Sequence, residues 1–213
     1  MTKRVVIVAG NIGVGKTSLT ERLGTRLGWR TAYESVADNP YLPDFYADMK
    51  SWAFHLQIFF LGHRAQQYLE MTGGEQSVIL DRSIYEDAFI FARALHHMGN
   101  LGERDYLAYR RVFDLVVGGL PAPDLLIYLR APVRVLMARI HSRGREIESS
   151  ISADYLALLE SFYDDWIKTF DACPVLTIHS DDLDFVHKPG HLDIVVARIQ
   201  DRLAGKEDLV FPQ

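Results

Sequence analysis

Short apolar runs alternate with longer amphipathic runs along the chain. The apolar runs predict strands at 4–10, 30–35, 77–83, 124–130 and 174–180. The longer runs repeat their apolar positions with the period of a helix, at 16–28, 52–70, 84–97, 103–118, 132–142, 152–171 and 191–203. Strands that alternate with helices indicate right-handed crossovers. The pattern therefore predicts an α/β fold, a five-stranded parallel sheet with helices on both faces.

Length and composition suit one globular domain spanning residues 1–213. The chain is 48% hydrophobic and 24% charged, and it shows no repeat or linker. A net charge of −5 argues against nucleic acid as a partner, and no run approaches the ~20 apolar residues that span a bilayer. The N-terminal segment has no cleavable signal site, and the single cysteine, Cys173, cannot form an internal disulfide. We therefore expect a cytoplasmic protein with no membrane partner.

The segment GNIGVGKT matches the phosphate-loop pattern G-x-x-x-x-G-K-T and lies between a predicted strand and a predicted helix. Its backbone N–H groups and the helix N-terminus favour phosphate binding. Lys16 is expected to reach the β- and γ-phosphates, and Thr17 to offer its hydroxyl to Mg²⁺. The expected ATP-binding residues are Gly10, Asn11, Ile12, Gly13, Val14, Gly15, Lys16, Thr17 and Ser18, joined by Arg139 and Arg143.

The phosphate loop leaves the fate of the γ-phosphate open. A GTPase switch carries D-x-x-G and N-K-x-D, and neither pattern occurs here. A compact phosphate-loop protein is typical of a small-molecule kinase, whose acceptor residues lie at the carboxyl ends of the strands. Glu34 lies at the carboxyl end of the second predicted strand, and Asp81, Arg82 and Ser83 lie at that of the third. Ser83 is also a candidate N-cap for the next helix.

Polar side chains interrupt the apolar face of two predicted helices. Gln57 and Arg64 share a face with Phe60, and Asp87 shares one with Phe91. Buried amides and guanidinium groups need partners. The pattern predicts either a nucleobase pocket or an internal ion pair between Arg64 and Asp87.

The segment RIHSRGREIE, Arg139–Glu148, concentrates arginines around Gly144 at a predicted helix end. It is either a helix C-terminus whose basic residues interact favourably with the helix dipole, or an arginine-rich lid over about 139–150.

The segment YDDW at 163–166 is expected to be a solvated helix face.

These blocks resemble the deoxyribonucleoside kinase family over nearly the whole chain and in the family's order. DNPYLPDFY, DRSIYED and FDACPVL are most similar to the bacterial deoxyadenosine and deoxyguanosine kinases. The resemblance implies a P-loop kinase fold, a homodimer, and ATP-dependent phosphorylation of the 5′-hydroxyl of a deoxyribonucleoside for nucleotide salvage.

The resemblance also implies a role for each matched residue. Glu34 would take the proton from the 5′-hydroxyl, and Arg82 would hold the 5′-oxygen. The implied catalytic residues are Glu34, Arg82, Lys16, Arg143 and Arg145. The implied nucleoside-binding residues are Glu34, Tyr46, Gln57, Arg64, Arg82, Asp87, Phe91 and Glu148. Thr17 and Asp81 would hold the metal, with Asp81 standing where the family often has glutamate.

The family's base pocket implies a substrate order. Retention of both Arg64 and Asp87 favours a purine deoxynucleoside or deoxycytidine over thymidine, and the likeness of DRSIYED favours deoxyadenosine, then deoxyguanosine.

One alternative function is that of a thymidylate-type nucleoside monophosphate kinase, which would need extra cations where Tyr46 and Glu148 stand. Another is a non-catalytic P-loop binding protein, which typically loses the lysine, the base or the arginines that are present here.

Overall fold

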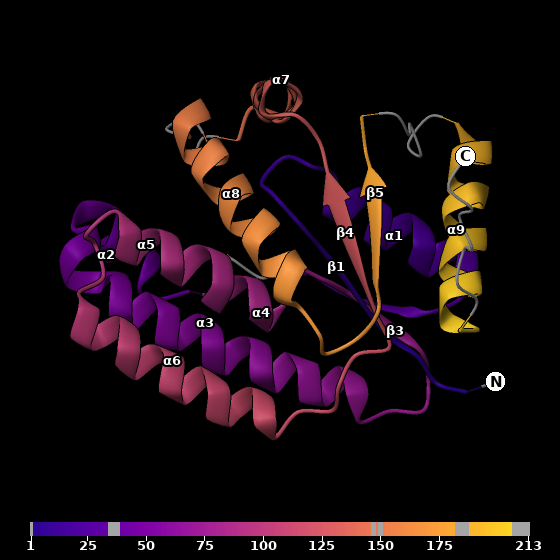
Figure 1. Cartoon of the computed structure of the whole chain (residues 1–213), viewed down its shortest axis with the longest axis horizontal. Coiled ribbons are helices and arrows are strands. Elements are labelled where there is room, and N and C mark those ends of the chain that lie inside the picture. The colour runs from indigo at the N-terminus through magenta and orange to yellow at the C-terminus, as the bar shows by residue number, and fades with distance from the viewer. Residues whose placement is uncertain (1, 34–38, 146–147, 149–150, 182–187, 206–213) are drawn as a thin grey trace.

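The computed structural model describes residues 2–33, 39–145, 148, 151–181 and 188–205. Its centre is a parallel sheet with the strand order β2-β3-β1-β4-β5 (Figure 1). The strands are β1 (Val5–Gly10), β2 (Arg30–Ala32), β3 (Val78–Asp81), β4 (Leu125–Arg130) and β5 (Val175–His179). Every pairing between them is parallel, which confirms the α/β prediction and its five-stranded sheet.

Helices cover both faces of this sheet (Figure 1). One face packs against α1 (Lys16–Leu27), α7 (Val133–Arg143) and α9 (Pro189–Leu203). The other packs against a larger set: α3 (Met49–Thr72), α4 (Ile84–Glu86), the π-helix η1 (Asp87–Ala92), α5 (Arg93–His97), α6 (Glu103–Gly118) and α8 (Ala153–Thr169). The short α2 (Leu42–Ala47) lies against α3.

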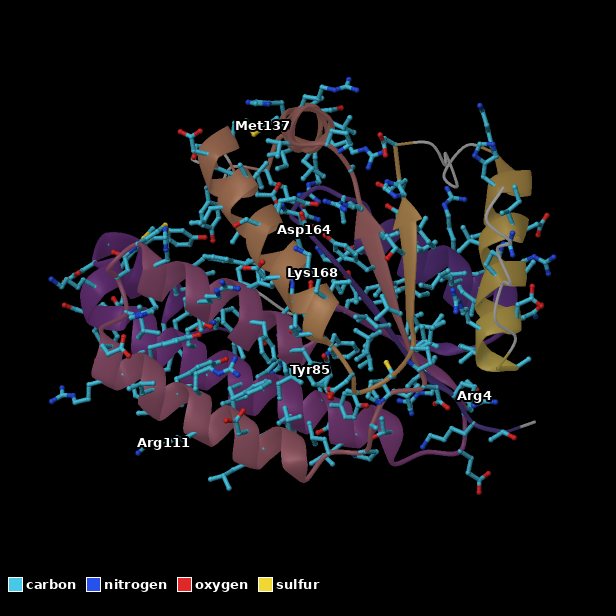
Figure 2. All side chains as sticks on the ribbon, in the orientation of Figure 1. Arg4, Tyr85, Arg111, Met137, Asp164 and Lys168 are labelled. Atoms are coloured by element: carbon cyan, nitrogen blue, oxygen red, sulfur yellow. The ribbon has the colours of Figure 1, made fainter. Side chains whose placement is uncertain are left out.

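The two faces hold two apolar cores. Alternate residues of β1 enter opposite cores, with Ile7 and Ala9 in one and Val6 and Val8 in the other. Figure 2 shows side chains filling the space between the sheet and its helices, with Tyr85 inside and Arg111 pointing outward from α6. Burial on both faces explains why the central strands are almost wholly apolar.

The structure differs from the prediction in three places. The single helix expected at 84–97 is divided, because its middle, Asp87–Ala92, is a π-helix that a 3.6-residue pattern does not reveal. The helix α2 was not among the predicted elements. The solvated face expected at 163–166 is wrong, because Tyr163 and Trp166 are buried. These two continue the apolar stripe of α8 at helical spacing, and only the aspartates between them reach solvent.

Gly10 ends β1 at a place where no other residue fits. Its φ is 144°, and a Cβ there would lie 2.3 Å from the carbonyl oxygen of Leu129 on β4. Glycine at this position therefore lets the chain turn from β1 into the phosphate loop while its backbone stays in close contact with β4.

Among the described residues, no helix has both the length and the apolar character that crossing a membrane requires.

Two helical glycines differ in the space around them and predict opposite stability effects. A Cβ on Gly24 of α1 would lie 2.3 Å from Cγ2 of Thr31, whereas a Cβ on Gly62 of α3 would meet nothing within 4 Å. Gly24→Ala should lower the free energy of unfolding by about 1–3 kcal/mol through overpacking. Gly62→Ala should raise it by about 0.5–1 kcal/mol through helix propensity. Urea denaturation followed by circular dichroism measures both, and a Gly24→Ala protein as stable as wild type would contradict the packing.

Candidate active site

The phosphate loop and the turn after β3 lie side by side at the carboxyl edge of the sheet. β1 pairs with β3 so that Val8 is opposite Asp81. The backbone N–H of Arg82 then donates to the carbonyl of Val8 at 2.9 Å, which carries the pairing one residue beyond β3. Open parallel sheets bind ligands at this edge.

The loop after β1 has the backbone of a phosphate site. Gly13 and Gly15 adopt positive φ values of 81° and 105°. The Lys16 ammonium lies over the loop and donates to the carbonyls of Gly10 at 2.7 Å and Asn11 at 3.1 Å. α1 begins at Lys16 without a side-chain cap, so its dipole and first N–H groups face the loop. This geometry suits the phosphates of a nucleoside triphosphate.

Asn11 holds the loop from the side. Its amide nitrogen donates to the Leu156 carbonyl at 2.9 Å and to Glu160 at 3.2 Å, both on α8, while its oxygen accepts the Ile12 N–H. The Asn11 side chain is thus bound to the protein, and the contact of Asn11 with ATP stays a prediction.

The two predicted metal ligands come together. The Thr17 hydroxyl donates to a carboxylate oxygen of Asp81 at 2.5 Å, although the two residues come from different segments of the chain. Asp81 is buried at the end of β3. A hydroxyl and a carboxylate are oxygen ligands of the kind that Mg²⁺ binds, so the residues present fit this ion.

Arg82 is held in a strained conformation. Its φ is 73°, and no other non-glycine residue in the described ranges has a positive φ. Such a backbone costs roughly 1–2 kcal/mol. The guanidinium carbon lies 4.5 Å from the centre of the Phe91 ring, so the predicted acceptor arginine and the predicted stacking aromatic are in contact. Strain of this kind is concentrated at functional sites.

The predicted base-reading side chains are buried between α3 and η1. The exposed fractions of Gln57, Arg64 and Asp87 are 4%, 5% and 3%. Arg64 and Asp87 form an ion pair, so that predicted alternative is present. The Gln57 side-chain oxygen, however, has no hydrogen-bond partner among the described residues. A buried acceptor left in this way is open to a donor from a ligand or from water.

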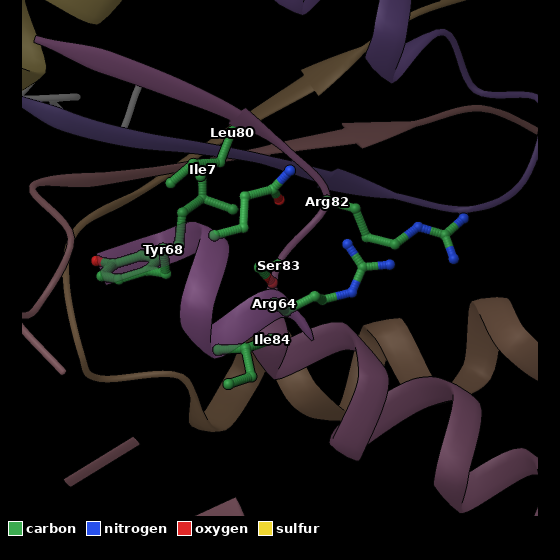
Figure 3. A pocket seen from close by; sticks show the side chains of 8 residues that line it. Ile7, Arg64, Tyr68, Leu80, Arg82, Ser83 and Ile84 are labelled. Carbon is green, nitrogen blue, oxygen red and sulfur yellow. The ribbon is translucent and has the colours of Figure 1, made fainter. Parts of the chain in front are cut away.

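A small pocket lies between Arg64 and the turn after β3. Arg64 and Arg82 line it together with Ser83, and Ile7 and Leu80 of the sheet form an apolar wall. Figure 3 shows both guanidinium groups on one side of the pocket, while Tyr68 points to the opposite side. Arg64, predicted to bind the base, and Arg82, predicted to hold the 5′-oxygen, are therefore neighbours.

The arginine-rich segment pairs with its own glutamate. Arg143 donates to both carboxylate oxygens of Glu148 at 2.6 Å, and an Arg145 nitrogen lies 3.6 Å from the same carboxylate. Gly144 has a φ of 64° and ends α7 between them. We expected the arginines to serve the donor phosphates and Glu148 to serve the sugar. In the structure the two sets pair with each other, because opposite charges at this short spacing attract, and both roles stay predictions.

Arg139 lies apart from that pair. Its guanidinium donates to the Val14 carbonyl at 3.0 Å and to the carbonyl of Ser180, just after β5, at 2.8 Å. In this arrangement Arg139 links the phosphate loop to the end of β5. Its contact with ATP stays a prediction.

Two tyrosines, Tyr46 on α2 and Tyr155 on α8, lie near each other and near predicted site residues. Tyr46, predicted to contact the sugar, is 49% exposed, and its pKa is raised by partial burial and by the nearby Glu148 carboxylate. Tyr155 on α8 was not predicted. Burial raises the pKa of the Tyr155 hydroxyl, Arg82 acts against that rise, and Tyr46 adds to it. Tyr155 thus lies close to both predicted site residues, and no sequence motif marks it.

The predicted general base, Glu34, lies outside the described residues. So do 146–147 and 149–150 of the predicted lid. Their roles stay predictions.

Comparison with known proteins gives one consistent result. The family model described as deoxynucleoside kinase matches residues 6–204. A deoxyadenosine/deoxycytidine kinase of Bacillus subtilis is 39% identical over 197 residues, covering 92% of this chain and 91% of the relative. A deoxyguanosine kinase of Lactobacillus acidophilus is 36% identical over 208 residues, covering 93% and 90%. The solved structure of a deoxyadenosine kinase from M. mycoides superposes with a TM-score of 0.78 at 27% identity, covering 92% of this chain and 99% of that one.

Proposed function

The chain belongs to the deoxynucleoside kinase family and is a phosphotransferase, and on this premise we propose that its preferred acceptor is deoxyadenosine. ATP with Mg²⁺ is the donor, deoxyguanosine is the second acceptor, and deoxycytidine is also accepted. The active unit is one domain spanning residues 1–213, working in nucleotide salvage in the cytoplasm.

One observation supports the base preference: Arg64 of the buried Arg64–Asp87 pair lies on the same face of α3 as Gln57, whose buried oxygen is unsatisfied. An amide oxygen and a carboxylate accept hydrogen bonds, and the bases of deoxyadenosine, deoxyguanosine and deoxycytidine all carry an amino group that donates. Thymine carries none. The B. subtilis and L. acidophilus relatives are named for such amino-bearing nucleosides, though not for the same ones.

The proposed reaction uses positioning more than covalent chemistry. The 5′-oxygen forms a bond to the γ-phosphorus as the bond to the β-phosphate oxygen breaks, and ADP leaves. Glu34 takes the proton of the 5′-hydroxyl, a step that contributes about 10²–10⁴-fold when the base is within hydrogen-bond reach. Arg82 steadies the attacking oxygen, and Lys16 binds the β- and γ-phosphates. Mg²⁺ held near Thr17 and Asp81 would offset the phosphate charge.

The lid completes this arrangement. A sugar 3′-hydroxyl that bonds to Tyr46 and Glu148 would compete with Arg143 for the Glu148 carboxylate. The released Arg143, with Arg145, would then reach the transferring phosphoryl group. The presence of a carboxylate and a phenol at the sugar end also favours a neutral nucleoside over a nucleoside monophosphate.

A coupled assay with ATP and Mg²⁺ tests the proposal on all four deoxynucleosides. Deoxyadenosine should give the highest kcat/KM, and thymidine should stay at the level of a Lys16→Met control, which reports contaminating kinases. Transfer to deoxynucleoside monophosphates instead of nucleosides would replace this proposal with a monophosphate kinase. If the phosphoryl group is transferred to neither class of acceptor, the chain is a non-catalytic nucleotide-binding protein.

Substitution of the ion pair tests the base pocket. Arg64→Met combined with Asp87→Ala should lower kcat/KM for deoxyadenosine by at least about 10-fold and admit thymidine, because each lost hydrogen bond to a base contributes on the order of 1–3 kcal/mol. Arg64→Met alone serves as the stability control. It leaves the Asp87 carboxylate buried without its partner and should lower the free energy of unfolding by about 3–5 kcal/mol. An unchanged order of substrates in the double variant would refute the assignment.

Replacement of a lid arginine should separate catalysis from stability. Arg143→Ala should lower kcat by about 10²–10³-fold, since it removes a cation from the transition state, and should barely move Tm. Arg134→Ala is the matched control, because Arg134 is an exposed arginine at the other end of α7. Equal loss of kcat and of thermal stability in Arg143→Ala would mean that the segment is only a helix terminus.

The homodimer also stays a proposal. Exposed apolar side chains on adjacent helices α3 and α6 suit a contact between two copies: Leu69, Leu107, Val112 and Leu115. Sedimentation equilibrium at micromolar protein distinguishes a dimer from a monomer.

A further inference from the structure

Glu86 is a buried carboxylate for which the proposed reaction has so far given no role. It ends the three-residue helix α4 and has no exposed surface. One carboxylate oxygen accepts the N–H of Gly10 at 3.2 Å and the hydroxyl of Tyr163 at 2.7 Å. The other accepts the N–H of Ser83 at 2.8 Å and lies 3.3 Å from the Ser83 hydroxyl. These donors offset the loss of hydration that a buried charge suffers.

The partners of Glu86 belong to the two halves of the site. Gly10 is the first residue of the phosphate loop, and Ser83 directly follows the strained Arg82. A single carboxylate therefore bonds the backbone that holds the donor phosphates and the backbone that directs the acceptor arginine. Capping of the short helix α4 explains the Ser83 contacts, but it requires neither Gly10 nor Tyr163.

Tyr163 ties this carboxylate to α8. Its side chain is fully buried, and its hydroxyl lies 2.7 Å from Glu86 and 2.9 Å from the Gly10 carbonyl. A hydroxyl donates one proton, and the Gly10 carbonyl already accepts from Lys16, so the shorter contact to Glu86 takes the Tyr163 proton. Burial, followed by the Glu86 carboxylate, raises the pKa of the Tyr163 hydroxyl well above its ordinary value and keeps that proton in place.

We propose that Glu86 and Tyr163 form a clamp that fixes the phosphate loop relative to Arg82 and so aligns the γ-phosphoryl group with the acceptor oxygen. The inference rests on the proposed kinase function. Both are positioning residues, because their contacts are with the backbone of the site. Misplacement of the two halves by about 1 Å would affect transfer by up to about 10²-fold while leaving each binding site whole.

Two substitutions loosen the clamp without removing bulk. Glu86→Gln keeps the shape but turns one acceptor into an amide donor, which then faces either the Gly10 or the Ser83 N–H. Tyr163→Phe removes only the hydroxyl. Asp124→Asn is the matched control, because Asp124 also accepts a backbone N–H, that of Val5 at 2.7 Å, but at the amino end of β1, away from both segments.

The test compares kcat, Tm and the separate Kd values for ATP and deoxyadenosine, the latter by calorimetry. We expect Glu86→Gln to lower kcat by about 10–100-fold and Tyr163→Phe by several-fold, with both Kd values within about twofold of wild type. The double variant should lose less than the product of the single losses, since the residues act as one unit. Asp124→Asn should lower Tm comparably and leave kcat unchanged.

Wild-type kcat in both single variants would overturn the clamp. So would a loss of kcat that accompanies weaker binding of both ligands, since that is general loosening. If Glu86→Gln does not fold, the milder Tyr163→Phe decides alone. Wild-type protein assayed alongside separates the kinase proposal from the clamp proposal. If the wild type does not phosphorylate deoxynucleosides, the proposed kinase function is refuted. If the wild type and both variants are fully active, only the clamp is refuted.

Discussion

The parallel pairing of β1 with β3 is the constraint on which the site depends. With Val8 opposite Asp81, the loop that leaves β1 and the turn that leaves β3 begin within hydrogen-bonding distance of each other. The contact between Thr17 and Asp81 and the hydrogen bond from the Gly10 N–H to Glu86 both follow from this register. A shift of one residue in this pairing would turn the Asp81 side chain to the other face of the sheet, away from Thr17. The chemistry is therefore set by strand pairing before any ligand binds.

Several features of this edge oppose stability. Arg82 has a left-handed backbone, Gln57 keeps an unsatisfied oxygen, and a carboxylate is fully buried at Glu86. Each costs free energy that the two apolar cores on either side of the sheet offset. What the protein gains is a set of charges and donors already oriented before the substrates arrive. Preorganisation of this kind stabilises a transition state because little has to reorganise during the reaction.

Local patterns predicted the frame of the molecule well. The strands, the phosphate loop and the position of Asp81 and Arg82 follow from hydrophobic period and from a motif whose context can be checked in the sequence. The π-helix at Asp87–Ala92 could not be foreseen, since it keeps the composition of an α-helix and changes only the hydrogen bonding.

Contacts made across the fold were harder to predict. Tyr163 was misjudged because two aspartates in its segment suggested a solvated face, while the stripe that it shares with Leu159 and Phe162 was the stronger signal. The pairing of Arg143 with Glu148 was missed because each residue was assigned to a ligand instead of to the other. The nearness of Tyr155 to Arg82 depends on how α8 packs beside η1, and spacing along the chain carries no trace of it.

Calorimetric titration with a linked compound tests the central claim most directly. The compound joins deoxyadenosine, through its 5′-oxygen and a chain of phosphates, to the 5′-oxygen of adenosine. If one continuous edge holds both donor and acceptor, this compound should bind at least about 10²-fold more tightly than ATP or deoxyadenosine alone, because the second contact becomes intramolecular. A Kd equal to that of ATP would mean that the phosphate loop and the base pocket do not form one active site.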